Sequence, residues 1–144
     1  MRVAIIGAEA RKFTDLGEAR AYDLILSLLG PHDILVSGHC HLGGIDIWAE
    51  EAAAQMRLKT LIFPPKSLSW EAGYKPRNLA IAHNCDILYN LVVDVLPPGF
   101  KGMRHKLCYH CHTDAHIKSG GCWTALQVQR MGKPAHWRTI DNGV

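Results

Sequence analysis

Residues 2–7 read RVAIIG, a run of small and β-branched apolar side chains that ends at a glycine. A short apolar run closed by a turn residue is typical of a strand buried on both faces of a parallel sheet. Runs of the same kind follow at residues 33–37, 60–63, 86–93 and 135–140. Between them lie segments with the 3.6-residue spacing of a helix, at residues 15–29, 45–57, 76–83 and 122–131.

This alternation predicts an α/β fold, a Rossmann-like doubly wound parallel sheet of about five strands. The expected strand order is 3-2-1-4-5. It forms a single domain over residues 1–144, with a loop insertion at residues 95–122 after the fourth strand. In open sheets of this type, ligands bind at the carboxyl ends of the strands, beside the point where the strand order reverses. We therefore expect a binding site near the loops that follow the first and fourth strands.

The composition fits a globular domain, since 48% of the 144 residues are hydrophobic and 20% are charged. Lysine and arginine are scattered apart from residues 104–106, so the net charge of +3 does not predict nucleic-acid binding. No apolar run is long enough to span a membrane. The first residues lack a cleavage site typical of secretion. The five cysteines therefore indicate reduced thiols in the cytoplasm, and they favour metal binding over disulfides.

Cysteine and histidine concentrate in residues 105–122, HKLCYHCHTDAHIKSGGC. We predict a Zn2+ site from four of these residues: Cys108, Cys111, His116 and Cys122. Thiolates and imidazoles at such close spacing suit a tetrahedral zinc ion, and His105 is the alternative fourth ligand. Four protein ligands would make the zinc structural, whereas three would leave a position for a catalytic water. The simpler alternative is a loop that is merely rich in both residue types.

The predicted zinc site continues directly into a glycine-rich turn, because Cys122 follows Ser119, Gly120 and Gly121. Residues 95–118 contain few core-forming side chains, and a loop of this length needs something to order it. A structural zinc can supply on the order of 10 kcal/mol for that purpose. If Cys122 is a ligand, the metal fixes the turn, and chelation is expected to weaken ligand binding there.

Two glycine-rich turns lead from a strand into a helix, at residues 37–46, SGHCHLGGID, and at residues 119–121, SGG. Glycine lets backbone N–H groups approach an anion closely, and a helix N-terminus adds the positive end of its dipole. Either turn alone is explained equally well as a tight turn. Together, at the same edge of the sheet, they favour a phosphate-bearing ligand.

In their order along the chain, these motifs resemble the SLOG superfamily of Rossmann-like nucleotide-binding domains, nearest its YspA/YpsA-type members. The resemblance rests on the glycine closing the first strand, the two turns, an Arg-Asn pair at residues 77–78 and Asp-Ile-Leu opening the fourth strand. It covers most of the chain but not residues 95–118. The ligand contacts that it implies are Gly7, Ser37, Gly38, Gly43, Gly44, Asp46, Arg77, Asn78, Ser119, Gly120 and Gly121.

The resemblance implies a nucleotide or nucleotide-derived ligand, such as a nucleoside phosphate or an ADP-ribose-like molecule, and it suggests a homodimer. In its first glycine-rich turn the chain departs from the family, because it has Gly38-His39-Cys40-His41-Leu42-Gly43 where similar domains often have Gly-Gly-Ala-x-Gly. It lacks the Pro-Gly-Gly-x-Gly-Thr-x-x-Glu signature of the related Lonely-guy phosphoribohydrolases, so that activity is not implied. Cys122 also stands where similar domains often have threonine.

Further candidate contacts flank these motifs. Glu9 follows the first strand and contacts a base or ribose, or else is a surface charge beside a helix. Asp46 caps its helix and orders the turn, or binds a ribose. Trp70 stacks on a base or packs as a lid over the core. His39 contacts the ligand or is solvated.

Other residues have plainer interpretations. Cys40 is either an activated thiolate at a helix N-terminus or, more simply, a small residue that packs a tight loop. Cys85 is expected to be a buried core thiol. Trp48 and Trp123 stand at helical core spacing and are expected to pack in the interior.

Three functions are compatible with these features. The favoured one is the binding of a nucleotide-derived ligand beside a structural zinc. The first alternative is hydrolysis of a nucleotide, as an N-glycosidase or phosphoesterase, with Glu9 or Asp46 as acid or base. The second alternative is a nucleic-acid binder of the zinc-knuckle type, which the scattered basic residues disfavour.

Overall fold

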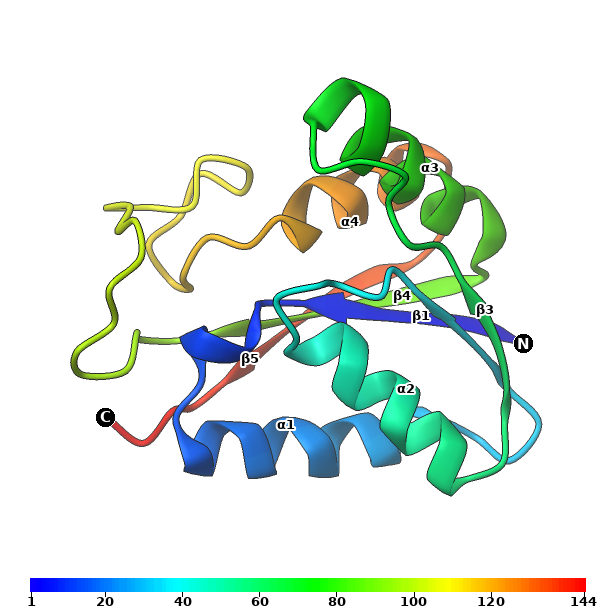
Figure 1. Cartoon of the computed structure of the whole chain (residues 1–144), viewed down its shortest axis with the longest axis horizontal. Coiled ribbons are helices and arrows are strands. Elements are labelled where there is room, and N and C mark those ends of the chain that lie inside the picture. Colours follow the sequence, from blue (N-terminus) through cyan, green and yellow to red (C-terminus); the bar gives the residue numbers. More distant parts are fainter.

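The computed structural model describes all 144 residues and is built on a five-stranded sheet. The strands are all parallel and lie in the order β3-β2-β1-β4-β5, which confirms the predicted topology (Figure 1). They are β1 (Arg2–Gly7), β2 (Ile34–Ser37), β3 (Lys59–Ile62), β4 (Ile87–Val93) and β5 (Ala135–Ile140). Because β1 lies between β2 and β4, the strand order reverses beside it, and the loops after β1 and β4 separate at that point.

Four α-helices cover the sheet, two on each face (Figure 1). They are α1 (Asp15–Leu28), α2 (Ile45–Gln55), α3 (Lys75–Asn84) and α4 (Gly121–Arg130). Neighbouring side chains of a strand point to opposite faces, so Ile5 joins the core with α1 and α2, whereas Ile6 joins the core with α3 and α4. A strand buried on both faces needs no polar positions, which explains the unbroken apolar run at the start of the chain. None of the helices combines the length and the apolar character that crossing a bilayer requires.

The predicted strands and helices agree with the observed ones to within two residues at each end. The segment before α3 contains a turn that lies outside the predicted helices and strands. This is one wide helical turn, η2 (Trp70–Tyr74), whose start is capped by the Ser69 hydroxyl accepting from the N–H of Ala72 at 3.3 Å. Gly73 makes this turn possible, because a Cβ there would overlap the carbonyl oxygen of Ser67. A short 3-10 turn, η1 (Ala10–Lys12), also follows β1.

The insertion between β4 and α4 forms no helix or strand of its own, in agreement with the prediction. It leaves the carboxyl end of β4 and returns to the first turn of α4, at the left of Figure 1. Its internal order is slight, with one isolated bridge between Cys108 and Thr113. Near its other end, the N–H of Ile117 donates to the carbonyl oxygen of Val93 in β4 at 2.8 Å, so the segment is tied to the sheet close to its ends.

One buried side chain connects three segments at this edge of the sheet. Asn142, in the tail after β5, is 2% exposed. Its Nδ2 group donates to the carbonyl oxygens of Lys12 at 2.9 Å and of Val95 at 2.7 Å. Its Oδ1 atom accepts a hydrogen bond from the N–H of Thr14 at 3.1 Å. The tail thus joins η1, the start of α1 and the start of the insertion.

Candidate functional site

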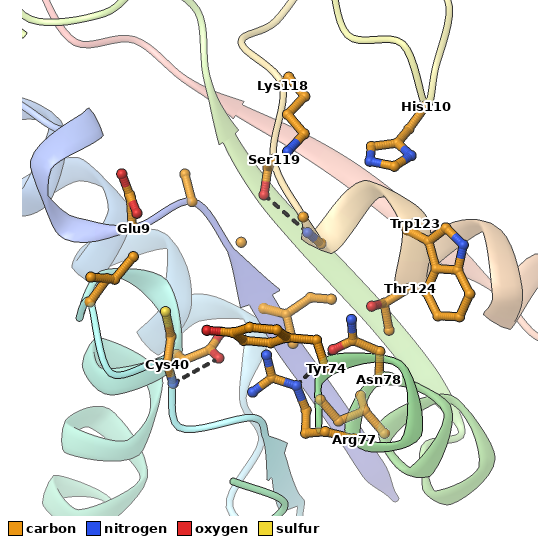
Figure 2. A pocket seen from close by; sticks show the side chains of 18 of the residues that line it. Glu9, Cys40, Tyr74, Arg77, Asn78, His110, Lys118, Ser119, Trp123 and Thr124 are labelled. Atoms are coloured by element: carbon orange, nitrogen blue, oxygen red, sulfur yellow. Dashed lines mark hydrogen bonds between the residues drawn. The ribbon is translucent and has the colours of Figure 1, made fainter. Parts of the chain in front are cut away.

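A cavity of about 520 Å3 lies beyond the carboxyl end of β1, where a fold of this type binds its ligands (Figure 2). Its walls come from the loops after β1 and β2, from η2 and α3, and from the insertion and the first turn of α4. The volume falls within the range of roughly 300–1,000 Å3 that small-molecule sites occupy. The cavity is therefore large enough for a nucleotide-sized molecule.

Nine of the residues predicted to contact a ligand line this cavity. They are Gly7, Glu9, Asp46, Trp70, Arg77, Asn78, Ser119, Gly120 and Gly121. Five do not line it, namely Ser37, Gly38, His39, Gly43 and Gly44. All five belong to the first glycine-rich turn, so the two turns differ in their relation to the cavity.

The first glycine-rich turn packs two loops together. A Cβ at Gly44 would lie 2.3 Å from the carbonyl oxygen of Ala8, and the φ of 88° at Gly44 also disfavours any other residue. The N–H of Ile45, the first residue of α2, donates to the same carbonyl oxygen at 3.2 Å. The glycine at this turn therefore faces the loop after β1 and not a ligand.

Asp46 lines the cavity from the first turn of α2 and is 6% exposed. It does not cap the helix, whose N-cap is Gly44, so the capping interpretation is wrong. Its Oδ2 atom accepts from the backbone N–H of Cys40 at 3.2 Å, which orders the turn as expected. Burial raises the pKa of Asp46 to about 6, against the lowering effect of the Arg77 guanidinium. A carboxyl group with such a pKa can exchange a proton near neutral pH.

Arg77 is held rigidly at the cavity wall. Its Nε group donates to Oδ1 of Asn78 at 2.7 Å, and its Nη1 group donates to the carbonyl oxygen of Gly38. The ring of Tyr74 lies 5.4 Å from the guanidinium carbon and covers it. Its Nη2 group has no acceptor within the protein, so these donors remain for a ligand.

Positive charge also lies on the opposite wall, where Lys118 and Ser119 face Arg77 across the cavity (Figure 2). The Lys12 Nζ group donates to the carbonyl oxygen of Lys118 at 2.8 Å, and burial lowers the pKa of Lys12. At the start of α4, the Ser119 hydroxyl accepts from the N–H of Gly121 at 3.2 Å. Two lysines and a helix N-terminus therefore make this wall attractive to an anion.

Glu9 lies at the same edge of the cavity, where it pairs with the guanidinium of Arg11. Its side chain is 13% exposed, so it is a partly buried carboxylate and not a fully exposed surface charge. Glu9 therefore has the position expected of it from the sequence, but its charge is already partnered within the protein.

Two indole rings form one side of the cavity. Trp70 of η2 and Trp123 of α4 pack edge to face with ring centroids 4.8 Å apart, and both line the cavity. Trp123 therefore packs, as its spacing suggested, but it is half-buried at the cavity wall and does not lie in the core. Trp48, in contrast, packs against Phe13 in the core, as predicted. Trp70 is 43% exposed, so part of its ring is free for a stacking partner.

Residues 37 and 39 of the first turn are engaged with Glu50. Its carboxylate accepts from the Ser37 hydroxyl at 2.9 Å and lies 2.8 Å from Nδ1 of His39. Cys40 lines the cavity, but burial raises the pKa of its thiol, which contradicts an activated thiolate and agrees with a packing role. Cys85 is buried in the core beside α3, as predicted.

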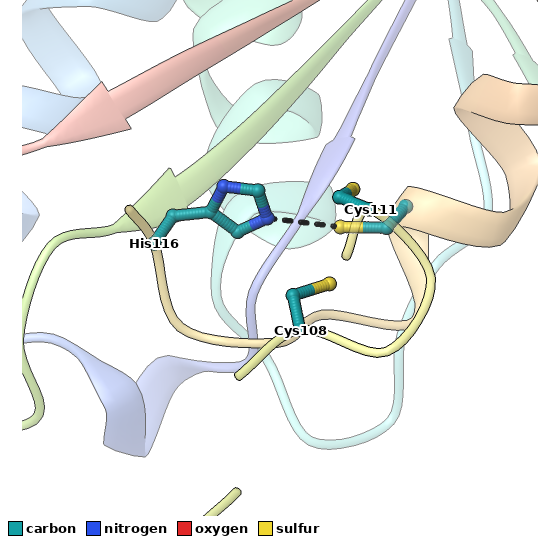
Figure 3. A group of neighbouring side chains, drawn as sticks. Cys108, Cys111 and His116 are labelled. Atoms are coloured by element: carbon teal, nitrogen blue, oxygen red, sulfur yellow. Dashed lines mark hydrogen bonds between the residues drawn. The ribbon is translucent and has the colours of Figure 1, made fainter. Parts of the chain in front are cut away.

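The four predicted metal ligands come together in and next to the insertion (Figure 3). The ligand atoms of Cys108, Cys111, His116 and Cys122 all lie within 4.8 Å of one another. The Nε2 atom of His116 lies 3.7 Å from Sγ of Cys122. Zn–S and Zn–N bonds of about 2.3 and 2.0 Å in a tetrahedral site hold such atoms roughly 3.6 Å apart, so this pair already has suitable spacing. His105, the alternative ligand, is exposed and lies outside the group.

The chemistry of these side chains also suits a cation. Burial acts to raise the pKa of the Cys108 thiol, but the N–H groups of Cys111 and His110 offset it and leave the pKa lowered. Burial raises the pKa of Cys111 to about 12, and the neighbouring thiols add to that shift. Burial lowers the pKa of His116, which favours the neutral imidazole that binds metals. A divalent cation would stabilise thiolates that cannot all ionise without it.

Several cavity residues were not predicted. Tyr109 and His110 lie between the first two metal ligands, and Lys118 lies between the last two. Their positions among the predicted metal ligands, within residues 108–122, gave no indication that they would line the ligand cavity. The available signal was the attachment of that segment after the fourth strand, next to the reversal of strand order.

Comparisons of the chain with protein-family models, with curated proteins and with solved structures found no significant match. The resemblance to the SLOG superfamily therefore stays a prediction from the sequence motifs. The cavity and the cluster of Cys108, Cys111, His116 and Cys122 are therefore the features that bear on function.

Proposed function

We propose that this protein binds a nucleotide or nucleotide-derived ligand in the cavity beyond β1, and that a structural Zn2+ orders the neighbouring insertion. The observation that carries the proposal is the pairing of cationic and aromatic groups in one cavity. Arg77, Lys12 and Lys118 offer positive charge, and Trp70 and Trp123 offer indole rings. A nucleotide carries both an anionic phosphate and a flat base, so it uses both kinds of wall.

The charges favour a ligand with an anionic group. Three cationic side chains line the cavity, and one of its two carboxylates, Glu9, is already paired with Arg11. The other, Asp46, has a pKa raised to about 6 by burial and is partly protonated below neutral pH. The remaining charge is therefore positive, which attracts phosphate more strongly than a neutral ligand.

Zinc is the metal that fits the donor set best. Three thiols and one imidazole are soft ligands, and a group of four protein ligands closes a tetrahedral site. Three of the four, Cys108, His116 and Cys122, are buried, which agrees with a structural role more than with a catalytic one. Such a thiolate centre is expected in a reducing compartment such as the cytoplasm.

The proposal is tested by native mass spectrometry of the purified protein, followed by calorimetric titration of the zinc-loaded protein. The titration compares nucleoside monophosphates and diphosphates with the matching nucleosides and with inorganic phosphate. We expect nucleotides to bind at least about tenfold more tightly than either part alone, because both walls are then used. The variant Arg77→Gln weakens binding, whereas Arg138→Gln on β5, which makes the same charge change away from the cavity, does not. Equal binding of nucleosides and nucleotides would contradict the proposal.

A second candidate function is nucleotide hydrolysis, which the raised pKa of Asp46 favours. A carboxyl group with a pKa of about 6 beside a guanidinium can donate or accept a proton at the ligand. Chromatography of nucleotides incubated with the protein would reveal released base or phosphate. Loss of that product in Asp46→Asn, with binding retained, would establish the enzyme over the binding module.

A further inference from the structure

The metal cluster and the ligand cavity are built from the same stretches of chain. The turn from Cys108 to Cys111 carries Tyr109 and His110, both of which line the cavity. The stretch from His116 to Cys122 carries four further lining residues, at positions 118–121. Each stretch begins and ends at a metal ligand, so fixing the ligands fixes the cavity wall between them.

We infer that the metal controls ligand binding in the cavity. The part of the cavity wall formed by residues 109–110 and 118–121 keeps its binding shape only while the metal is bound. This inference rests on the proposed function and adds a mode of regulation to it. It does not depend on which nucleotide binds. The metal does not touch the ligand, and it acts by holding one wall of the cavity in position.

The connection at α4 is short and direct. Cys122 is the second residue of this helix, and its N–H donates to the carbonyl oxygen of Ser119 at 3.1 Å. The fully buried Asn90 amide of β4 contacts Cys122 in either orientation. Its Nδ2 group donates to Sγ at 3.4 Å or, turned over, its Oδ1 accepts from the N–H of Cys122 at 3.3 Å. Gly121 packs so closely on Asn90 that a Cβ would lie 2.4 Å from its Oδ1 atom. A shift at the metal ligand therefore moves the start of α4.

Few hydrogen bonds order the other stretch. Within it, the N–H of Cys108 donates to the carbonyl oxygen of Thr113 at 2.7 Å, and the N–H of His112 donates to the carbonyl oxygen of Cys108 at 2.8 Å. The ring of Tyr109 is 50% exposed and packs on His110 and beneath the Nζ of Lys118. The contact of Tyr109 with Lys118 joins the two stretches to each other. Their links to β4 lie elsewhere, where Cys108 shares a buried cluster with Val92 and the N–H of Ile117 donates to the carbonyl oxygen of Val93 at 2.8 Å. Without the metal, both stretches lose the centre that holds them.

The metal centre has its own access from outside. A groove of about 400 Å3 lies against the metal loop and is lined by two of its ligands, Cys111 and His116. Leu126 and Trp137 also line this groove, which shares with the ligand cavity only His110 among its lining residues. Metal can therefore enter or leave without passing through the ligand cavity. This separation allows metal supply to act on ligand binding as an independent signal.

Linkage requires the effect to be reciprocal. If the metal raises the affinity for the ligand by some factor, the ligand raises the affinity for the metal by the same factor. Allosteric couplings of this kind commonly amount to about 5- to 150-fold. We expect a factor of at least about tenfold here, because one entire wall of the cavity depends on the metal.

The deciding experiment measures amide hydrogen exchange of the whole protein with zinc bound and after zinc removal by a chelator. We expect exchange at Tyr109, His110 and residues 118–121 to accelerate at least about tenfold, while β1 and α1 keep their rates. Cys111→Ser reproduces this pattern in the presence of zinc, and His105→Ala, an exposed histidine outside the cluster, does not. Unchanged exchange in the cavity wall after zinc removal would overturn the inference.

A second arm separates this inference from the proposed function. Adenosine monophosphate is titrated into the zinc-loaded and zinc-free protein, and zinc release to a chromogenic chelator is followed with and without the nucleotide. Tighter binding with zinc and slower release with nucleotide support the coupling. If no nucleotide binds the zinc-loaded protein, the proposed function fails, while hydrogen exchange still decides whether the metal controls the cavity.

Discussion

Trp70 and Trp123 meet edge to face, with ring centroids 4.8 Å apart and ring planes at 86°. The first belongs to η2, before α3, and the second to the first turn of α4, so their contact joins two separate segments across the cavity wall. In edge-to-face packing the edge of one ring covers a face of the other, and the remaining faces stay available for stacking. The pair therefore serves as both a wall and a recognition surface.

Replacing Trp70 by alanine is expected to lower nucleotide affinity by at least about tenfold, because stacking of a base on an aromatic ring contributes roughly 1–3 kcal/mol. The free energy of unfolding changes by less than about 1 kcal/mol, since the ring is 43% exposed. Calorimetric titration and urea unfolding measure the two effects. Trp48→Phe, a change in the buried core, is the matched control with the opposite pattern: lower stability and unchanged affinity.

The metal centre is expected to bind one zinc ion per chain, with the four ligands of the cluster. Changing an outer contact of a metal ligand commonly costs 10- to 100-fold in affinity, so His116→Ala is expected to cost at least about 100-fold. Competition with a chelator of known affinity measures this loss. His112→Asn is the control: His112 is next to a ligand but outside the cluster, and asparagine tolerates its φ of 55°. Equal zinc affinity in both variants would remove His116 from the site.

The buried carboxyl group of Asp46 predicts a pH dependence of stability. Its pKa is raised from 3.8 to about 6 in the folded protein, so the folded state holds a proton that the unfolded state has lost. Stability therefore falls as the pH rises from about 4 to about 6, by on the order of 3 kcal/mol in total. Asp46→Asn is expected to flatten this slope in urea unfolding, whereas Glu9→Gln keeps it. If the free energy of unfolding had the same pH dependence in the wild type and in Asp46→Asn between about pH 4 and about pH 6, the assignment would be contradicted.

Two glycines of the glycine-rich turns are expected to respond differently to alanine. At Gly44 a Cβ would meet the Ala8 carbonyl oxygen at 2.3 Å with φ at 88°, so Gly44→Ala is expected to cost more than about 3 kcal/mol of stability. At Gly120 φ is −60° and no atom lies within 4 Å of a Cβ, so Gly120→Ala changes stability by about 0.5 kcal/mol or less. Thermal unfolding compares them. Because Gly120 lines the cavity, its variant is expected to weaken binding without unfolding the protein.

The sequence was sufficient for the fold because the three central strands, β1, β2 and β4, are largely buried and a helix lies between each pair of consecutive strands. Residues 3–7 carry an unbroken apolar run, and the run at residues 87–93 is interrupted only by Asn90, a pattern typical of central parallel strands. The metal ligands were also predictable, because Cys108 and Cys111 form a local turn whose geometry depends on spacing alone. In both cases, the information lies within a few neighbouring residues.

The positions that could not be predicted depend on how an element is rotated against the rest of the molecule. In α4, the buried residues are Cys122, Thr124, Ala125 and Val128. These small side chains face the sheet, which turns Trp123 toward the cavity although its spacing also fits a core position. At the first glycine-rich turn, the same glycines suit a phosphate or a close contact between loops, and only the position of Ala8 distinguishes the two.

The buried contacts of Asn142 give the end of the chain an influence on the cavity. Its amide satisfies the carbonyl oxygens of Lys12 and Val95, and Lys12 in turn donates to the carbonyl oxygen of Lys118 at the cavity wall. Replacing Asn142 would change no residue that lines the cavity. It would nevertheless leave those two carbonyl groups without their partner, and one of them belongs to Lys12. A substitution in the tail after β5 can thus weaken ligand binding from outside the cavity.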